Sequence, residues 1–214
     1  KPMQFNLYLP PCYDPARQPG YPVLYMLHGQ TYDQDQWLRL GIVDKADALI
    51  AAGELPPFMI VMPFEEYSLR DPFSTGFGKS LTDELLPWVD ANYNTCAERE
   101  CRAIGGLSRG GAWGIHLGFS RWELFSAIGA HSVPPFVGSG EQLGGWLEAI
   151  PDGEEPRISM DIGENDPYRG MAEEFEKCLT GYGVAHEWIL NPGSHTEDYW
   201  NAHVEEYLRW YWGE

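Results

Sequence analysis

Short apolar runs, separated by segments with helical spacing, recur along the whole chain. Residues 23–27 and 58–62 are continuous apolar runs, which end at His28-Gly29 and at Pro63. Such runs are typical of strands that are buried on both faces of a sheet. We predict further strands at residues 101–104, 125–130, 157–162 and 186–190. Residues 5–9 alternate and stop at two prolines, which indicates an edge strand.

Between these runs, apolar residues recur at the spacing of an amphipathic helix. Gly53 ends the first such segment, and Ser80 or Thr82 is the expected cap of the second. A further helix begins near residue 111, directly after the run at 101–104. The other expected helices are residues 37–52, 81–91, 171–179 and 197–212.

Strands that alternate with helices predict an α/β fold with a mostly parallel sheet and helices on both faces. The reason is that parallel neighbours need crossover connections. A chain of 214 residues can bury one sizeable core, and nothing in it suggests a second domain. We therefore expect a single domain over residues 1–214. Ligands of such sheets bind beyond the carboxyl ends of the strands.

Residues 106–110 read Gly-Leu-Ser-Arg-Gly, a G-x-S-x-G pattern between a predicted strand and a predicted helix. A serine on so sharp a turn adopts strained backbone angles, and small neighbours allow it to do so. Its hydroxyl then projects above the sheet, toward the amides of the next helix. The bare pattern occurs by chance in many proteins, but in this context it predicts the nucleophile elbow of a serine hydrolase. Ser108 is the predicted nucleophile.

A serine hydroxyl is a weak nucleophile near neutral pH and needs a base within hydrogen-bond distance. His195 lies between the last predicted strand and the last predicted helix, where this arrangement has its base. His28 is expected to brace the first loop, and His131 could line the pocket but is out of the usual chain order. The histidines inside or at the start of predicted elements are His116, His186 and His203.

The third member of a triad is an acid that follows the penultimate strand. Asp166 lies on the loop past that strand and is favoured, while Glu164 and Asp161 remain alternatives. Two backbone N–H groups are expected to stabilise the oxyanion of the tetrahedral intermediate, those of Gln30 and Arg109. The Arg109 side chain need not take part and is available for an ion pair at the start of the helix.

Six longer stretches of the chain match the pattern of a known family, namely residues 7–14, 21–29, 83–89, 105–111, 163–166 and 193–200. Together they resemble the esterase-D-like esterase family. That group includes feruloyl esterases of carbohydrate esterase family 1, enterochelin esterases, S-formylglutathione hydrolases and mycolyltransferases. The resemblance implies an α/β-hydrolase fold with Ser108, Asp166 and His195 as the catalytic triad.

The chain departs from the family pattern at two places. Arg109 stands where the family often has methionine, glutamine or alanine, which predicts a cationic rim to the oxyanion hole. Residues 132–156 form a short stretch, so we expect a minimal lid or none. An open cleft of that kind suits extended or polymer-attached acyl groups.

The charge and the cysteine content limit the classes of binding partner and the cellular compartments that we expect for this protein. Lys and Arg number 14 against 32 Asp and Glu, and a net charge of −18 repels phosphate backbones and anionic membranes. We therefore expect neither nucleic acid nor membrane as a partner.

The cysteines form no metal pattern with the histidines, so neither metal nor cofactor is expected. A Cys96–Cys101 disulfide would imply an oxidising compartment, whereas free thiols would suit the cytoplasm. Pairing of Cys12 with Cys178 stays open.

The family resemblance and the aromatic content favour a secreted esterase that releases hydroxycinnamoyl groups, ferulate for example, from plant cell-wall sugars. The substrate is then a small-molecule or polysaccharide-linked ester. The alternatives are an S-formylglutathione hydrolase-like thioesterase in the cytoplasm, a siderophore esterase, an acyltransferase or a non-catalytic ligand-binding relative. The expected substrate-binding residues are His28, Gly29, Trp37, Phe73 and His131.

Overall fold

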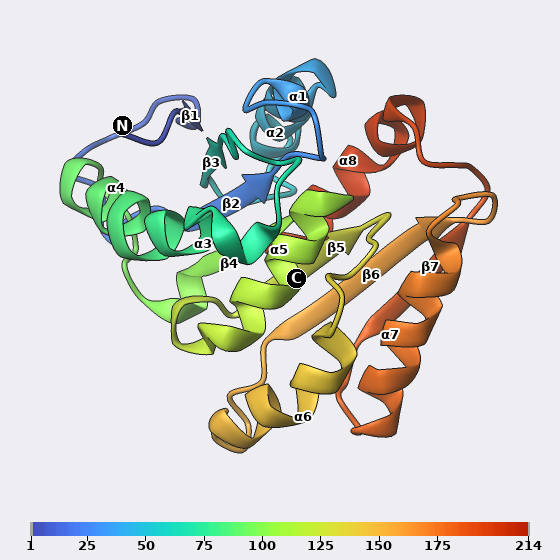
Figure 1. The fold of residues 1–214 in the computed structure, drawn as a ribbon. Coiled ribbons are helices and arrows are strands. Elements are labelled where there is room, and N and C mark those ends of the chain that lie inside the picture. Colours follow the sequence, from blue (N-terminus) through green and yellow to red (C-terminus); the bar gives the residue numbers. More distant parts are fainter. Residues whose placement is uncertain (1, 214) are drawn as a thin grey trace.

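The computed structural model describes residues 2–213, in which seven strands form one sheet with helices on both faces (Figure 1). The strand order is β1-β3-β2-β4-β5-β6-β7, and only β1 runs antiparallel to its neighbour. The predicted α/β fold with a mostly parallel sheet is confirmed. The strands are β1 (Phe5–Tyr8), β2 (Val23–Leu27), β3 (Met59–Pro63), β4 (Arg102–Leu107), β5 (Ala127–His131), β6 (Arg157–Gly163) and β7 (Glu187–Asn191).

Helices cover both faces of the sheet. Helices α1 (Gln36–Arg39), α2 (Ile42–Ala51) and α8 (Glu197–Trp212) pack on one face. The other face carries α3 (Phe77–Ser80), η2 (Leu81–Leu85), α4 (Leu86–Asn92), α5 (Arg109–Ser120), α6 (Ser139–Ala149) and α7 (Arg169–Gly181). Shorter 3-10 turns are η1 (Pro72–Ser74), η3 (Arg99–Cys101) and η4 (Trp122–Leu124). No helix within residues 2–213 is long and apolar enough to cross a bilayer.

Two helix predictions are wrong in detail. The predicted helix over residues 37–52 is two helices, because Gly41 lies between them with a left-handed φ of 76°. The predicted helix at 81–91 begins earlier, at Phe77, and continues through the π-helical η2. Thr82 therefore lies inside it, and its hydroxyl donates to the Gly78 carbonyl at 3.1 Å instead of capping a helix end.

Helix α6 was not predicted, and the last strand is partly exposed. Only Ser139 and Leu143 are buried in α6, so its sequence carries little amphipathic pattern. It packs between α5 and α7 as part of the sheet cover, which leaves the short 132–156 stretch without a large lid. In β7, Ile189 and Leu190 are 40% and 38% exposed because this strand forms an edge of the sheet.

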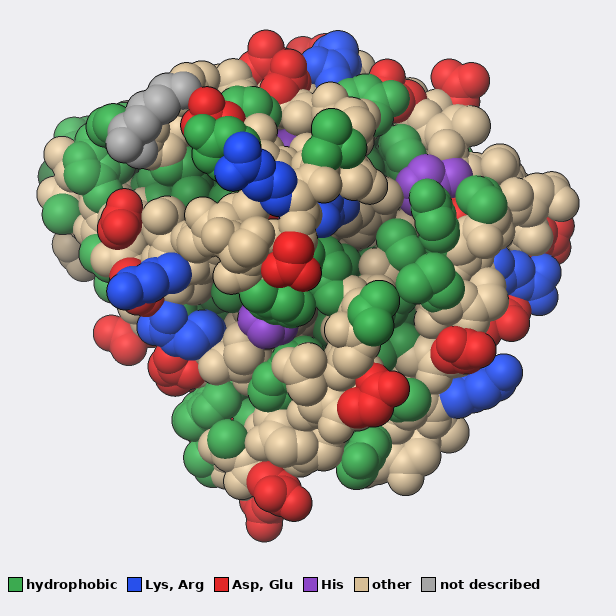
Figure 2. All heavy atoms as spheres, in the orientation of Figure 1, with side chains coloured by type: hydrophobic (Ala, Val, Ile, Leu, Met, Phe, Trp, Pro, Cys, Tyr) green, Lys and Arg blue, Asp and Glu red, His purple; other side chains and the backbone are tan. Residues whose placement is uncertain are grey.

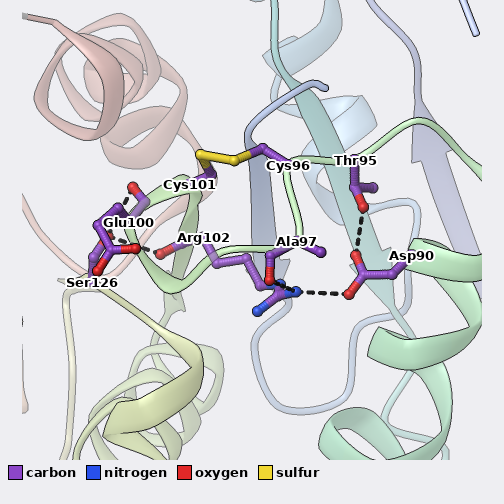
Figure 3. Close-up of a disulfide and its surroundings, with 8 residues drawn as sticks. All are labelled: Asp90, Thr95, Cys96, Ala97, Glu100, Cys101, Arg102 and Ser126. Carbon is purple, nitrogen blue, oxygen red and sulfur yellow. Dashed lines mark hydrogen bonds and ion pairs between the residues drawn. A yellow bond between two sulfur atoms is a disulfide. The ribbon is translucent and has the colours of Figure 1, made fainter. Parts of the chain in front are cut away.

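A disulfide closes the polar turn that leads into β4, as Figure 3 shows. It joins Cys96 to Cys101, which is one of the two alternatives that the sequence left open. Arg102, the first residue of β4, donates to Asp90 at 2.7 Å and to the Ala97 carbonyl at 2.6 Å. The turn is thus fixed by a covalent bond and by a partly buried ion pair. Cys12 and Cys178 do not pair with each other.

The centre of the sheet leaves no room for a side chain at Gly105, which gives a stability prediction. A Cβ at Gly105 would lie 1.7 Å from the Tyr211 hydroxyl and 2.6 Å from the Gly129 carbonyl. Gly105→Ala should therefore lower the free energy of unfolding by about 1–3 kcal/mol in urea denaturation. Gly145→Ala in α6 is the matched control, because a Cβ there meets nothing within 4 Å. It should raise the same quantity by roughly 0.5–1 kcal/mol.

Candidate active site

Ser108 sits on a sharp turn between β4 and α5. Its φ of 52° and ψ of −121° lie in a region that a residue with a side chain rarely adopts. The turn is pressed against the end of β2: a Cβ on Gly106 or Gly110 would lie 2.5 or 2.2 Å from the Leu27 carbonyl. Only glycine fits at these two positions. The Ser108 N–H also donates to the His131 carbonyl of β5 at 2.8 Å. The predicted strand-to-helix turn is present.

Ser108, His195 and Asp166 form one hydrogen-bonded line at the carboxyl ends of β4, β7 and β6. His195 Nε2 lies 3.0 Å from Ser108 Oγ, and His195 Nδ1 lies 2.8 Å from Asp166 Oδ2. Because an ionised carboxylate only accepts hydrogen bonds, Nδ1 carries the proton and Nε2 is left to accept from the serine hydroxyl. Asp166 and Ser108 are 5% and 8% exposed, so the line is largely shielded from water.

The loops that carry the acid and the histidine are fixed to each other. The Asn165 N–H donates to the Gly193 carbonyl at 2.9 Å, and the Ser194 hydroxyl donates to the Asn165 carbonyl at 3.2 Å. Tyr168 and Trp200 hold the His195 ring between them in edge-to-face contacts, each with ring centroids 4.9 Å apart. Neither aromatic contact is predicted by the sequence pattern. Closeness to Asp166 and His195 in the chain was the available signal.

The turn after β2 lies beside the serine. A Cβ on Gly29 would be 3.7 Å from the Ser108 Cβ. Within residues 2–213, neither the N–H of Gln30 nor that of Arg109 donates a hydrogen bond. These are the two groups that the sequence indicates as oxyanion donors, and both are available to a ligand. The Gly29 N–H, by contrast, is taken by the side chain of Gln36 at 2.8 Å.

The expected cationic rim at Arg109 is wrong, because a carboxylate neutralises the guanidinium. Arg109 Nε and Nη2 donate to the two carboxylate oxygens of Glu65 at 2.7 and 2.6 Å. The predicted ion pair at the start of the helix is present, with its partner on the loop after β3. Glu65 is not among the residues predicted from the sequence. A carboxylate soon after a buried strand was the only signal for it.

Two of the predicted substrate-binding residues lie in the core instead. Trp37 is fully buried and its indole N–H donates to the Leu27 carbonyl at 2.9 Å. His131 has both ring nitrogens engaged, by Asp161 at 2.6 Å and by the Tyr211 hydroxyl at 3.3 Å. The prediction that Trp37 and His131 contact a substrate is therefore wrong. Residues that end a strand or lie on the segment after it resemble pocket residues in sequence, but here both side chains pack on the α8 side of the sheet.

The alternative acids and bases lie outside the hydrogen-bonded line. Asp161 binds His131 and also accepts from the Tyr199 and Tyr207 hydroxyls at 2.7 and 3.0 Å, on the α8 side of the sheet. Glu164 is exposed. His186 contacts Glu176 and the Val184 carbonyl, and His203 contacts the Tyr199 carbonyl.

The remaining predicted contacts lie around the turn after β2 and on η1. His28 braces that turn through both ring nitrogens, so it supports Gly29 and has no nitrogen free for a substrate. Phe73 is 51% exposed and packs edge-on against Trp113 and Phe136, and its contact with a substrate stays a prediction. No cluster of three or more His, Cys, Asp or Glu side chains suited to a metal ion is found within residues 2–213.

Comparison with known protein families identifies the family of this chain. A family described as "Putative esterase" matches residues 1–211. The chain belongs to this esterase family. An endo-1,4-beta-xylanase/feruloyl esterase of Xylanibacter ruminicola is 36% identical over 96% of the chain, and Esterase Rv1288 of Mycobacterium tuberculosis is 34% identical over 89%. The chain spans only 27% and 52% of the length of these two relatives.

Solved structures share the α/β-hydrolase fold. A ferulic acid esterase superimposes with a TM-score of 0.84 at 22% identity, covering 97% of this chain and 91% of the other. An S-formylglutathione hydrolase (FrmB) of Staphylococcus aureus gives a TM-score of 0.76 at 17% identity, covering 98% and 92%. At these identities the likeness shows the fold alone.

His116, on α5, gives a prediction for the pH dependence of stability. Its Nδ1 has no hydrogen-bond partner within the described chain, and burial among Phe73, Trp113 and Trp146 lowers its pKa below 6.5. An unfolded chain therefore takes up a proton that the folded chain resists. The free energy of unfolding should fall as the pH drops below about 6.5 and be insensitive to this group above it.

His116→Phe removes this proton uptake. The stability difference, variant minus parent, should therefore increase as the pH falls from 7 to 5 in urea denaturation. Buried His28, whose pKa is also lowered by burial, remains in both proteins and cancels. A difference that is constant over this range would contradict the assignment.

Proposed function

We propose that this protein is a serine carboxylic ester hydrolase that releases hydroxycinnamoyl groups from plant cell-wall sugars. The observation that carries the proposal is the line from Asp166 through His195 to Ser108, with two unpaired backbone N–H groups beside it. An alcohol nucleophile, a base oriented by an acid, and donors for an oxyanion are the parts that acyl transfer requires.

The first half of the reaction acylates Ser108. Its Oγ forms a bond to the ester carbonyl carbon as His195 Nε2 takes the hydroxyl proton, and Asp166 stabilises the imidazolium. The carbonyl π electrons move onto oxygen, which accepts hydrogen bonds from the N–H groups of Gln30 and Arg109. The intermediate then collapses. The bond to the sugar oxygen breaks, and His195 returns the proton to the departing alcohol.

The second half repeats these steps with water. Water attacks the acyl carbon as His195 Nε2 takes its proton, and the same two N–H groups hold the oxyanion. The acyl–Oγ bond breaks, Ser108 recovers its proton from His195, and the free acid leaves. Each residue ends in its starting state, so no cofactor takes part in the proposed cycle.

Apolar side chains on the loops around the site support an aromatic acyl group. They lie on loops that follow β2, β3, β5 and β6, and each is more than one-third exposed. Figure 2 shows hydrophobic side chains gathered in a hollow across this view of the molecule, with acidic side chains around it. Aromatic and aliphatic surfaces of this kind suit a planar ring. The residues are Tyr32, Tyr67, Leu69, Phe73, Val137 and Tyr168.

The relative from Xylanibacter ruminicola, which is named for both xylanase and feruloyl esterase, supports the same substrate class. A feruloyl esterase that acts on cell-wall polymers works outside the cell. The Cys96–Cys101 disulfide fits such an oxidising compartment, because cytosolic thiols are kept reduced. We therefore include secretion in the proposal.

A panel of esters tests both the reaction and the substrate. The protein should release ferulate from methyl ferulate and from feruloylated arabinoxylan fragments. Ser108→Ala and Asp166→Asn should each lower kcat by on the order of 10⁴-fold or more, because they remove the nucleophile and the tautomer control of the base. Glu164→Gln is the matched control and should retain kcat, since this neighbouring carboxylate lies outside the hydrogen-bonded line. Product release is followed by chromatography.

The ester panel distinguishes a wrong assignment of the substrate from a wrong assignment of the reaction. Hydrolysis of acetyl or butyryl esters alone would contradict the hydroxycinnamoyl assignment and leave the esterase mechanism standing. Preference for S-formylglutathione would identify a thioesterase instead. Full activity in Ser108→Ala would overturn the mechanism itself.

A further inference from the structure

A buried ion pair lies behind the two proposed oxyanion donors. The side chains of Arg109 and Glu65 are 10% and 3% exposed, and they meet in a bidentate contact at 2.6 and 2.7 Å. Arg109 Nη2 also donates to the Arg70 carbonyl at 3.1 Å. The contact therefore fixes the loop after β3 against the first residue of α5.

Stability alone is a weak reason for such a pair. Removing two charges from water costs free energy that their mutual attraction often only offsets. A bidentate arginine–carboxylate contact does, however, define a geometry more closely than an apolar contact.

The main chain of Glu65 reaches the other donor through His28. The Glu65 N–H donates to His28 Nε2 at 2.9 Å, so this nitrogen must be unprotonated. The proton of the neutral ring is then on Nδ1, which donates to the Gly29 carbonyl at 2.7 Å. Burial lowers the pKa of His28, which agrees with a neutral ring.

The Gly29 carbonyl in turn fixes the direction of the Gln30 N–H. The Gly29–Gln30 peptide is trans, so its C=O and N–H bonds point in opposite directions. With the carbonyl held by His28 and by the Tyr32 N–H at 3.2 Å, the Gln30 N–H must point the other way. The Gly29 N–H is tied to Gln36, so the turn is held on both sides of this peptide.

A second contact joins the same two loops. The Thr31 N–H donates to the hydroxyl of Ser68, which is buried, at 3.1 Å. The loop after β3 thus supports the turn after β2 at two points. Glu65 contacts both elements, the turn after β2 through its main-chain N–H and α5 through its carboxylate.

We propose that Glu65 is a positioning residue, which aligns both N–H groups of the oxyanion hole. Its main chain orients the Gln30 N–H through His28, and its carboxylate holds Arg109, whose own N–H is the other donor. This inference rests on the proposed function, because the alignment matters only if an oxyanion forms at Ser108. Glu65 itself touches neither substrate nor the reacting atoms.

The test compares Glu65→Gln with a control that breaks another ion pair, whose arginine is buried. Asp90→Asn disrupts the Asp90–Arg102 contact at the amino end of β4, whereas Ser108 follows the carboxyl end of this strand. Both variants should be less stable to heat. Only Glu65→Gln should lower kcat for methyl ferulate, by about 10- to 100-fold, with KM changed less than about threefold. Complete loss of one donor costs about 10²- to 10³-fold, and misalignment costs less.

An aryl trifluoromethyl ketone is the second readout. It adds to Ser108 and leaves a tetrahedral oxyanion, so its inhibition constant reports on the two donors directly. That constant should rise in Glu65→Gln in parallel with the loss of kcat. It should not change in Asp90→Asn. A merely structural role for Glu65 would lower the melting temperature and leave this constant as it was.

A double variant keeps the proposal testable if Glu65→Gln does not fold. Glu65→Gln/Arg109→Met removes both charges, so no buried charge is left unpaired and stability should recover. The alignment is still missing, and ketone binding should stay at least about tenfold weaker than in the parent. Parental kcat and ketone affinity in either folded variant would overturn the inference. A parent protein without esterase activity would overturn the proposed function instead.

Discussion

The close packing of the β4–α5 turn against the end of β2 is the constraint on which the site depends. Ser108 adopts φ 52° only because its flanking glycines let the turn approach the Leu27 carbonyl, where any Cβ would overlap it. A strained backbone persists where the surrounding structure over-determines it. The same approach brings Gly29 beside Ser108. One packing contact therefore positions the serine and the turn that carries the Gln30 N–H.

The sheet order supplies the other half of the site. Asp166 and His195 follow β6 and β7, which are adjacent parallel strands, so their loops meet at the same edge of the sheet. Hydrogen bonds between the loops and the aromatic rings of Tyr168 and Trp200 then fix the imidazole. The result is a site whose parts come from strand ends, on the rigid framework of the sheet, and whose alignment relies on loop-to-loop contacts.

The features of the fold and of the site that depend on local sequence pattern could be predicted. Strands β2 and β3 are predicted by their continuous apolar runs. The G-x-S-x-G pattern predicts a strained turn between a strand and a helix, so Ser108 and the fold were predictable. Contacts between distant loops were not. Glu65 meets Arg109 across 44 positions of the chain, and no local pattern marks a carboxylate that will be buried there.

The wrong predictions concern side chains whose burial cannot be judged from their position in the sequence. Trp37 and His131 follow or border strand ends, as pocket residues do, yet both lie under α8 in the core. The edge position of β7 likewise depends on the order of the strands and not on the sequence of the strand itself. These outcomes are decided by packing between elements, which a single sequence does not specify.

The most direct test of the account is to map the site of covalent labelling by a fluorophosphonate probe on the folded protein. Peptide mass spectrometry should find one phosphonyl group, on Ser108, because its hydroxyl is hydrogen-bonded to His195. A folded protein that hydrolyses esters yet remains unlabelled, or is labelled at another residue, would contradict the account.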